Sequence, residues 1–280
     1  MRRLTAGLAV LGMLWALSGC AGAKGSAAGG SAPPATGPAR HRTAPVKQRD
    51  IHLSGRQLNL AVYYLRTFNG RRYLAPEWHP VPYTRAVAGA AVGELVGGEP
   101  YCPGSQRPFP AGARLRGVQV EDGTATVDLS GVGPRPSQWT LQALVHTLTQ
   151  FPTVRKVLVR VDGRALGGPL VRDPALPLVP IALAAPVPGA QVSGGRLVVR
   201  GEASVDEGTV GLRLRDDRGQ VMAQGHTTAA VGAPGRGPFA GALRFTPPAA
   251  PHPWTLEAFE VSAEDGEIVY LVQLPVWVGR

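Results

Sequence analysis

The thiol of Cys20 is the side chain in this sequence best placed to do chemistry. It is one of two cysteines, the other being Cys102, and it follows an apolar run from Leu4 to Leu17 that begins after Arg2 and Arg3. This 14-residue run is shorter than the ~20 residues that cross a membrane as a helix. A basic start and small residues at the end are typical of an export signal. Since thiolate is a strong nucleophile, the pattern predicts export followed by modification of Cys20.

The tetrad Leu17-Ser18-Gly19-Cys20 resembles the lipobox of bacterial lipoproteins. In that family a membrane protease cuts before the cysteine, the thiol receives a diacylglycerol, and the new N-terminus is usually acylated, palmitate being one such chain. The resemblance implies a signal peptide over residues 1–19, a cleavage region at Leu17, Ser18 and Gly19, and lipid attachment at Cys20. Two or more acyl chains, at ~0.8 kcal/mol per buried CH₂, anchor a protein stably. The alternative is an ordinary secretory signal in which Cys20 is incidental.

Residues 20–50 are predicted to be a lipidated flexible tether. They consist mainly of Gly, Ala, Ser, Pro and Thr, which bury too little apolar surface to offset the entropy lost on ordering. A coil of this length spans ~30 Å. The tether would therefore hold the folded part away from the membrane, on its extracytoplasmic face.

The charge of the chain is basic and unevenly distributed. Lys and Arg number 29 against 19 Asp and Glu, and residues 51–168 hold 13 basic and seven acidic residues. Basic residues beside a lipid anchor favour anionic headgroups, and a basic domain favours anionic wall polymers or an acidic protein partner. No combination of aromatic and basic residues typical of single-stranded nucleic-acid binding is present, so nucleic acid is not an expected partner.

No constellation of side chains predicts catalysis, a metal or a cofactor. The six histidines show neither HxxxH nor HExxH spacing, and His146, away from the apolar stripe of its expected helix, is predicted to be solvated. Asp128 and Ser130 lie on one side of an expected strand without a histidine base, which favours a structural role. Cys102 has no disulfide partner once Cys20 carries lipid, so it is predicted to be a half-buried thiol.

Two weaker binding signals remain open. The acidic pairs at 206–207, 216–217 and 264–265 could bind calcium between loops, although none has the spacing of a calcium loop. Four tryptophans could form binding platforms or simply fill the core: Trp78, Trp139, Trp254 and Trp277. The glycine-rich stretch at 96–104 lacks the Gly-Lys-Ser/Thr sequence that binds phosphate, so it is predicted to be a loop.

Residues 51–168 are predicted to form an α+β domain with the order β-α-β-β-α-β, a split sandwich in which two helices cover one face of a small sheet. Asp122-Gly123 between alternating apolar runs predicts a hairpin, and Gly117 predicts a bulge. Ser137 is the expected N-cap of the second helix, and Pro152 is expected to end it. The expected elements are a strand over 57–64, a helix over 83–96 capped by Thr84, strands on both sides of Asp122-Gly123, a helix over 137–151, and a strand over 155–161.

Residues 169–179 are predicted to be a proline-rich linker, and residues 180–280 an all-β immunoglobulin-like sandwich. The second region shows no convincing helical period, and its alternating runs are separated by turn residues at the spacing of an antiparallel sandwich. About seven strands are expected: one near Ile181 and others over 196–201, 209–215, 220–228, 239–245, 254–263 and 268–276.

Two stretches resemble domains of sporulation proteins. TLQALVHTLTQFPTVRKVLVRVDG, with PAGARLRGVQVEDGTATVDLSG and PYTRAVAGAAVGELVGG before it, resembles the GerMN domain over about residues 57–166, most specifically from Thr147 to Gly163. RLVVRGEASVDEGTVGLRLRDDRGQV and EVSAEDGEIVYLVQLPVWV resemble the immunoglobulin-like domain of bacterial spore germination over about residues 180–278. That family often has an aromatic residue beside the glutamate found here as Glu207, where this chain has Asp206.

The resemblance implies a non-enzymatic, lipid-anchored surface protein that acts as a scaffold or adaptor in sporulation or spore germination. Its expected partners are membrane lipid through Cys20 and other sporulation or germination envelope proteins. Self-association is also expected, because the first domain is similar to ring-building modules. One alternative is a ligand-binding lipoprotein for wall glycan or a germinant, which predicts an aromatic-lined cleft. Another is a wall-active hydrolase, which predicts paired carboxylates or a metal in one cleft.

Overall fold

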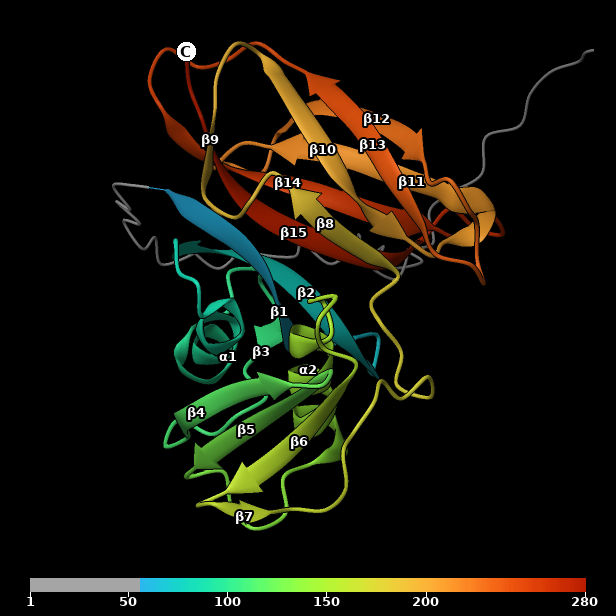
Figure 1. The fold of residues 1–280 in the computed structure, drawn as a ribbon. Helices are drawn as coiled ribbons and strands as arrows, with labels where there is room; N and C mark the ends of the chain where they lie inside the picture. The colour runs from blue at the N-terminus through green and yellow to red at the C-terminus, as the bar shows by residue number, and fades with distance from the viewer. Residues whose placement is uncertain (1–55) are drawn as a thin grey trace, which may run out of the picture. The chain divides into compact units, whose positions relative to one another are not determined.

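The computed structural model describes residues 56–280, and its first element is a long β-hairpin (Figure 1). Strand β1 (Gln57–Phe68) pairs antiparallel with β2 (Arg71–Pro82), and the short β3 (Ser105–Gln106) lies on the other side of β1. Asn69 and Gly70 form the turn with φ of 46° and 73°, the left-handed conformation that a two-residue hairpin turn requires. Strand β1 was predicted from the sequence and β2 was not; the internal prolines of β2 are tolerated because β2 is an edge strand.

A second sheet and two helices complete the first domain. The sheet has the order β4-β5-β6-β7, with β5 and β6 parallel. Its elements are β4 (Arg114–Glu121), β5 (Thr124–Ser130), β6 (Lys156–Val161) and β7 (Arg164–Ala165), and the helices are α1 (Val87–Gly97) and α2 (Gln138–Leu148). The α+β class is confirmed, and the predicted β-α-β-β-α-β series is present as β1, α1, β4, β5, α2 and β6, with β2, β3 and β7 added.

The helices lie between two sheets, which corrects the expectation that they cover one face of a single small sheet. Helix α1 contacts β1 and β4, and α2 contacts β1 and β6 (Figure 1). The reason for the difference is the β1–β2 hairpin, which builds its own sheet and covers the side of the helices that was expected to face solvent. Both helices are therefore buried on two sides.

Local signals in the sequence fix several of these elements. Asp122-Gly123 turns β4 into β5, and the pairing register shifts between Leu115 and Gly117, which confirms the hairpin and the bulge. The Ser137 side chain accepts a hydrogen bond from the backbone N–H of Thr140 at 3.1 Å, as an N-cap does. The first helix begins later than predicted, and Thr84 bonds to the Ala86 N–H in the turn before it.

The end of α2 closes the open edge of β1. The Gln150 side chain accepts from the Ala61 N–H at 3.0 Å and donates to the Ala61 carbonyl at 2.6 Å. The Thr147 hydroxyl accepts from the Tyr63 N–H at 3.0 Å. These two side chains thus replace the backbone of a neighbouring strand and satisfy groups of β1 that would otherwise lack partners.

The second domain is a sandwich of two sheets with the orders β13-β10-β8 and β12-β11-β14-β15-β9. Its strands are β8 (Ile181–Ala185), β9 (Ala190–Val192), β10 (Arg196–Ala203), β11 (Thr209–Arg215), β12 (Val221–Thr228), β13 (Gly237–Arg244), β14 (His252–Val261) and β15 (Ile268–Val278), with a 3₁₀ turn over Asp206–Gly208. The sandwich and its seven predicted strands are confirmed. The short β9, which pairs parallel with β15, was not predicted.

The segment 169–179 lies against the first domain. Leu170 exchanges backbone hydrogen bonds with Val157, and Leu74 bonds to Pro177 and Val179. The segment therefore has backbone contacts with the first domain near both of its ends. No helix within the described part of the chain combines the length and apolar character needed to cross a membrane.

Candidate functional site

The residues predicted to be cleaved and lipidated, Leu17, Ser18, Gly19 and Cys20, lie outside the described residues. The prediction of a lipid attachment site therefore stays a prediction. Within residues 56–280, charged side chains are brought together and buried where the two domains meet, around Arg66, Glu77, Cys102 and Tyr270. We call this region the domain junction, and it is the candidate functional site.

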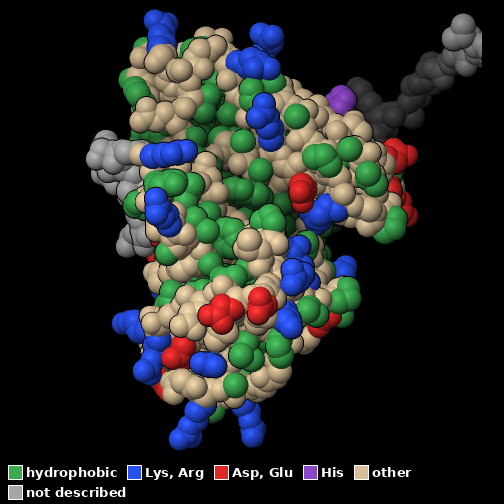
Figure 2. All heavy atoms as spheres, viewed as in Figure 1, with side chains coloured by type: hydrophobic (Ala, Val, Ile, Leu, Met, Phe, Trp, Pro, Cys, Tyr) green, Lys and Arg blue, Asp and Glu red, His purple; other side chains and the backbone are tan. Residues whose placement is uncertain are grey.

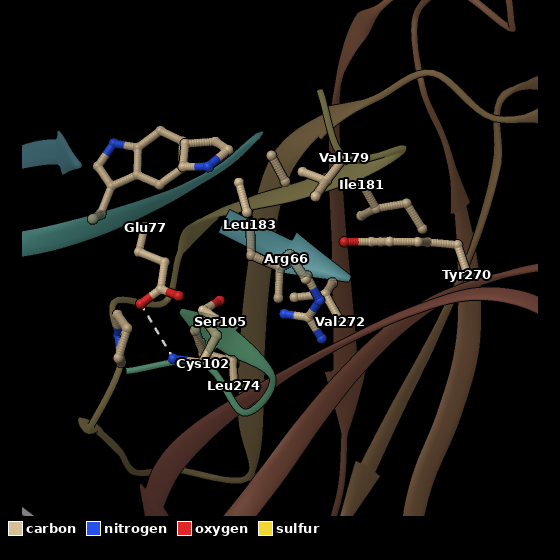
Figure 3. A pocket seen from close by; sticks show the side chains of 15 residues that line it. Arg66, Glu77, Cys102, Ser105, Val179, Ile181, Leu183, Tyr270, Val272 and Leu274 are labelled. Carbon is tan, nitrogen blue, oxygen red and sulfur yellow. Dashed lines mark hydrogen bonds between the residues drawn. The ribbon is translucent and has the colours of Figure 1, made fainter. Parts of the chain in front are cut away.

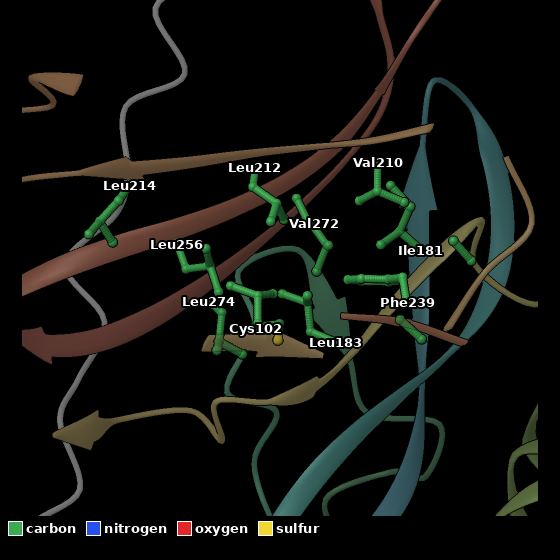
Figure 4. Close-up of a cluster of buried hydrophobic side chains, with 14 of the residues drawn as sticks. Cys102, Ile181, Leu183, Val210, Leu212, Leu214, Phe239, Leu256, Val272 and Leu274 are labelled. Carbon is green, nitrogen blue, oxygen red and sulfur yellow. The ribbon is translucent and has the colours of Figure 1, made fainter. Parts of the chain in front are cut away.

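The two domains share one hydrophobic core at the junction. Ala75 and Cys102 of the first domain belong to the same buried cluster as the sandwich core (Figure 4). The rings of Phe68 and Tyr73 lie 5.3 and 6.0 Å from the ring of Tyr270 on β15, distances at which aromatic pairs attract each other. Packing of this kind makes the relative position of the domains part of the fold.

A buried arginine joins the hairpin to the sandwich. Arg66 lies on the inward face of β1 and is 6% exposed. Its Nη2 donates to the backbone carbonyl of Leu271 on β15 at 3.1 Å. Hydrogen bonds from a charged donor are stronger than those between neutral groups, so this contact is a polar tie across an otherwise apolar surface.

A carboxylate–histidine–carboxylate row runs from helix α1 towards the junction. His79 is 1% exposed, and its Nδ1 lies 3.1 Å from an Oε2 of Glu94, while its Nε2 lies 3.8 Å from Glu77 Oε2. Burial alone would lower the pKa of His79, but the negative charges of Glu77 and Glu94, together with the hydrogen bond to Glu94, outweigh it, so the pKa is raised. Glu77 Oε2 also accepts from the N–H groups of Tyr101 and Cys102, at 2.6 and 3.2 Å.

A small cavity lies within the junction (Figure 3). Its free volume is about 10 Å³, which suits one water molecule and is too small for a sugar or peptide ligand. Three buried polar atoms of its lining residues have no partner among the described residues: Glu77 Oε1, Ser105 Oγ and the Tyr270 hydroxyl. Burial raises the pKa of the Cys102 thiol well above its ordinary value, so the nucleophilic thiolate is scarce there.

His146 is buried, and the prediction that it is solvated is wrong. It is 4% exposed, and its ring centroid lies 5.1 Å from that of Tyr63 on β1. Burial, with a smaller effect of the positive charge on Arg172, lowers its pKa to about 4. The physical reason is the additional sheet: the side of α2 that seemed free faces β1, so a residue away from the main apolar stripe is still covered.

Cys102 is also more deeply placed than predicted. It was expected to be half-buried, and it is 8% exposed, inside the cluster shared by the two domains. The sequence could not show this, because the second domain supplies most of its surroundings.

Other candidate residues have structural contacts. Asp128 Oδ2 lies 3.5 Å from Arg116 Nε, and its Oδ1 accepts from the Gly163 N–H at 3.0 Å, so it ties the β6–β7 turn to β5. Asp216 accepts from N–H groups of its own turn. Trp254 is buried in the sandwich core. Across residues 56–280, no group of three or more His, Cys, Asp or Glu side chains is arranged to hold a metal ion.

Arg66, Glu77 and His79 were not predicted from the sequence to be functional residues. A signal for them was present, because each continues an apolar series of alternate residues that ends inside the fold. Arg66 follows Leu60, Val62 and Tyr64, and Glu77 and His79 lie between Ala75 and Val81; all of these residues are buried. The dipeptide Asn69-Gly70, a strong hairpin signal, would have placed both strands.

Comparison with known proteins identifies both domains. Residues 61–167 match the model of a family described as "Sporulation and spore germination", and residues 180–267 match that of an "Immunoglobulin-like domain of bacterial spore germination". Both resemblances noted in the sequence are confirmed by these matches. A search of curated proteins gives no match.

Three solved structures are similar to parts of the chain. The first is the tandem GerMN domains of the sporulation protein GerM from Bacillus subtilis, at 27% identity and a TM-score of 0.35, with 42% of this chain and 46% of that chain covered. The first GerMN domain alone gives 28% identity and 0.35, covering 41% and 96%. A putative lipoprotein from Clostridium perfringens gives 21% identity and 0.28, covering 44% and 93%. The chain thus spans less than half of the tandem structure.

Proposed function

Because the chain joins a GerMN domain to an immunoglobulin-like domain of bacterial spore germination, we propose that it is a lipid-anchored scaffold or adaptor of sporulation or spore germination. It acts without catalysis, through protein–protein association, on the extracytoplasmic face of the cell membrane. Cys20 carries the lipid, residues 21–50 form the tether, and the two domains present the contact surfaces.

The observation that carries the proposal is the continuous core at the junction. An adaptor must hold its binding surfaces at fixed positions, and the shared cluster of Ala75 and Cys102 with the sandwich provides this. The buried charged residues of the junction already have structural partners: Arg66 bonds to Leu271 across the two domains, and Glu77 bonds to the Tyr101–Cys102 backbone within the first domain. These roles support a structural function for the residues that would otherwise be candidates for chemistry.

The basic first domain supports an additional contact with anionic wall polymers. Lys and Arg side chains project from the end of the view in Figure 2 where Figure 1 places the four-stranded sheet. Exposed Lys156 and Arg160 alternate on β6 with the buried Val157 and Val159, so they point away from the helices. Exposed basic side chains attract polyanions from solution.

The two cysteines allow a sharp test of the anchor. The full chain is expressed in an endospore-forming host as Cys20→Ala and, as the matched control, Cys102→Ala. The proposal predicts that the wild type and Cys102→Ala sediment with membranes and begin, by mass spectrometry, at a diacylglycerol-modified Cys20. Cys20→Ala should be released or retain its leader. An unmodified Cys20 in the wild-type protein would overturn the anchor.

The adaptor role is tested by capture of partners. Wild-type chain cross-linked in sporulating cells and solubilised in detergent should retain defined envelope proteins. A variant with Arg66→Met at the junction should retain fewer of them if both domains act as one body. Capture of none by the wild type at any stage of sporulation or germination would overturn the adaptor role while leaving the anchor intact.

The ligand-binding alternative is less well supported. The larger described depression, about 440 Å³ beside α2, is lined by Gln138, Leu141, Gln142 and residues 169–174, and none of these is aromatic. Glycan sites commonly use aromatic faces, so this lining does not favour wall glycan. Calorimetric titration with muropeptides would favour this alternative if it gave saturable binding.

A further inference from the structure

Strand β4 presents a free edge. It is the last strand of the sheet β4-β5-β6-β7, and no backbone hydrogen bond from another described element reaches the side away from β5. In Figure 1 it lies at the opposite end of this sheet from β7, on the side of α1. Six of its eight residues are exposed, including Val120 at 39%. An exposed edge of this length is a template for pairing with another strand.

The turn determines which backbone groups of β4 point outward. Glu121 and Thr124 flank the two-residue turn Asp122-Gly123, and the pair that closes such a turn exchanges hydrogen bonds. Since bonded and non-bonded pairs alternate along an antiparallel ladder, Glu121 and Gln119 bond to β5. Val118 and Val120 therefore direct their N–H and C=O groups to the free edge.

We propose that a second copy of this chain pairs with β4 antiparallel, with a two-fold axis at Val118. In this register Glu121 of each copy lies opposite Arg114 of the other, and Val120 lies opposite Leu115. Arg114 and Glu121 share the outer face, because their β5 partners alternate with buried residues. Leu115 and Val120 share the inner face by the same argument. Between the two copies, therefore, opposite charges meet on the outer face and apolar side chains meet on the inner face.

The bulge is necessary for this match. Arg116 is the extra residue on β4, because Leu115 pairs with Leu129 and Gly117 pairs with Asp128. Without it, residues 114 and 121 would point to opposite faces, since side chains alternate along a strand. Arg116 itself is held by Asp128 and Asp162 at 3.5 and 3.2 Å, so its charge is partly balanced within the chain.

The end charges select one alignment. Charged residues on an edge strand usually oppose pairing, and like charges directly opposite each other are destabilising. A parallel alignment would place Arg114 beside Arg114 and Glu121 beside Glu121, whereas the antiparallel alignment places opposite charges together. Arg114 uses Nη1 for bonds to the carbonyls of Ala111 and Ala113, and its remaining N–H groups can reach a carboxylate.

One strand pair buries less area than the ~1,200–2,000 Å² of a stable interface, so the expected dimer is weak and depends on concentration. If the chain is anchored by lipid as proposed, a shared membrane raises its effective concentration. The inference deepens the proposed function by naming the interface through which the scaffold binds itself.

The test uses charge reversal in the full chain, purified in detergent and followed by sedimentation equilibrium at matched detergent density. Arg114→Glu and Glu121→Arg should each weaken dimerisation by about tenfold or more, since each dimer then contains two like-charge pairs. An equimolar mixture of the two variants should dimerise again, because every contact joins opposite charges. The double variant should also regain the wild-type constant, and Arg164→Glu, exposed on β7 of the same sheet, should not change it.

A monomeric wild type at all concentrations, single variants that dimerise normally, or a mixture that stays monomeric would overturn the proposed register. A misfolded variant cannot imitate the result, because recovery in the mixture requires both chains to be folded. Failure here leaves lipid attachment and capture of envelope proteins untouched, so it is distinguishable from failure of the proposed function.

Discussion

Replacing Arg66 by methionine tests whether the junction couples the two domains. The change keeps an unbranched side chain in the inward position on β1 and removes the donor to the Leu271 carbonyl, a bond of 3.1 Å. Losing a hydrogen bond from a charged group costs ~1.5–3 kcal/mol. Relief from burying a charge offsets part of this, so we expect the free energy of unfolding to fall by about 2 kcal/mol.

This loss is large enough to measure. In a cooperative unit of 150–250 residues each 1 kcal/mol lowers Tm by about 2–4 °C, so Arg66→Met should lower Tm by about 4–8 °C. Arg160→Met is the matched control, because Arg160 is exposed on the outer face of β6; its Tm should stay within about 1–2 °C of the wild type, as for an ordinary surface change.

Hydrogen exchange locates the effect. Because the broken bond joins β1 to β15, amide protection should fall in peptides from both strands, and by similar free energies. A loss confined to the first domain would show that the sandwich is stabilised independently. Such a result would refute the shared core as a source of stability, whatever the change in Tm.

Three further changes test individual contacts. His79 has a raised pKa, so the stability it contributes is complete in mild acid and is lost as pH rises through its folded pKa. Urea unfolding across this range should show a fall in the free energy of unfolding, and His79→Gln should make that free energy depend less on pH. Glu257 is 3% exposed and is paired with Arg213 and Arg215 at 2.5 and 3.0 Å. Glu257→Ala should therefore lower the free energy of unfolding, measured with urea, by about 3 kcal/mol. Gln150→Ala removes both hydrogen bonds to Ala61 and should lower the free energy of unfolding by about 1–3 kcal/mol in the same assay. An unchanged free energy of unfolding would show that water replaces these bonds.

Local signals in the sequence were enough to predict most elements of both domains. Asp122-Gly123 gives a turn that only a few dipeptides favour, and Ser137 satisfies an N–H at the start of α2, so each acts through neighbours in sequence. Strand alternation in the sandwich likewise depends on a repeat of two residues, and β11 was predicted at the residue limits it has, Thr209–Arg215. Where the physical cause is local, the sequence alone was sufficient.

The errors concern contacts between distant segments. The prolines of β2 outweighed the hairpin signal of Asn69-Gly70, although the edge position of β2 makes them acceptable, and without β2 the second sheet above the helices was missed. His146 was placed in solvent for that reason, because its burial depends on β1, more than 80 residues earlier in the chain. Arg66 was missed for a related reason: its position continues the apolar series of β1, but its partner Leu271 belongs to another domain.

The segment that most resembles the GerMN family is linked to the junction by strand β1. Thr147 and Gln150 fix the edge of β1 at Tyr63 and Ala61, and the same strand carries Arg66 to the sandwich a few residues later. β1 is paired with β2 along its whole length, and its register is strongly specified because a slip of one residue would reverse every side chain. The polar residues after α2 therefore hold the register of the strand that joins the domains, which links a motif of one domain to the placement of the other.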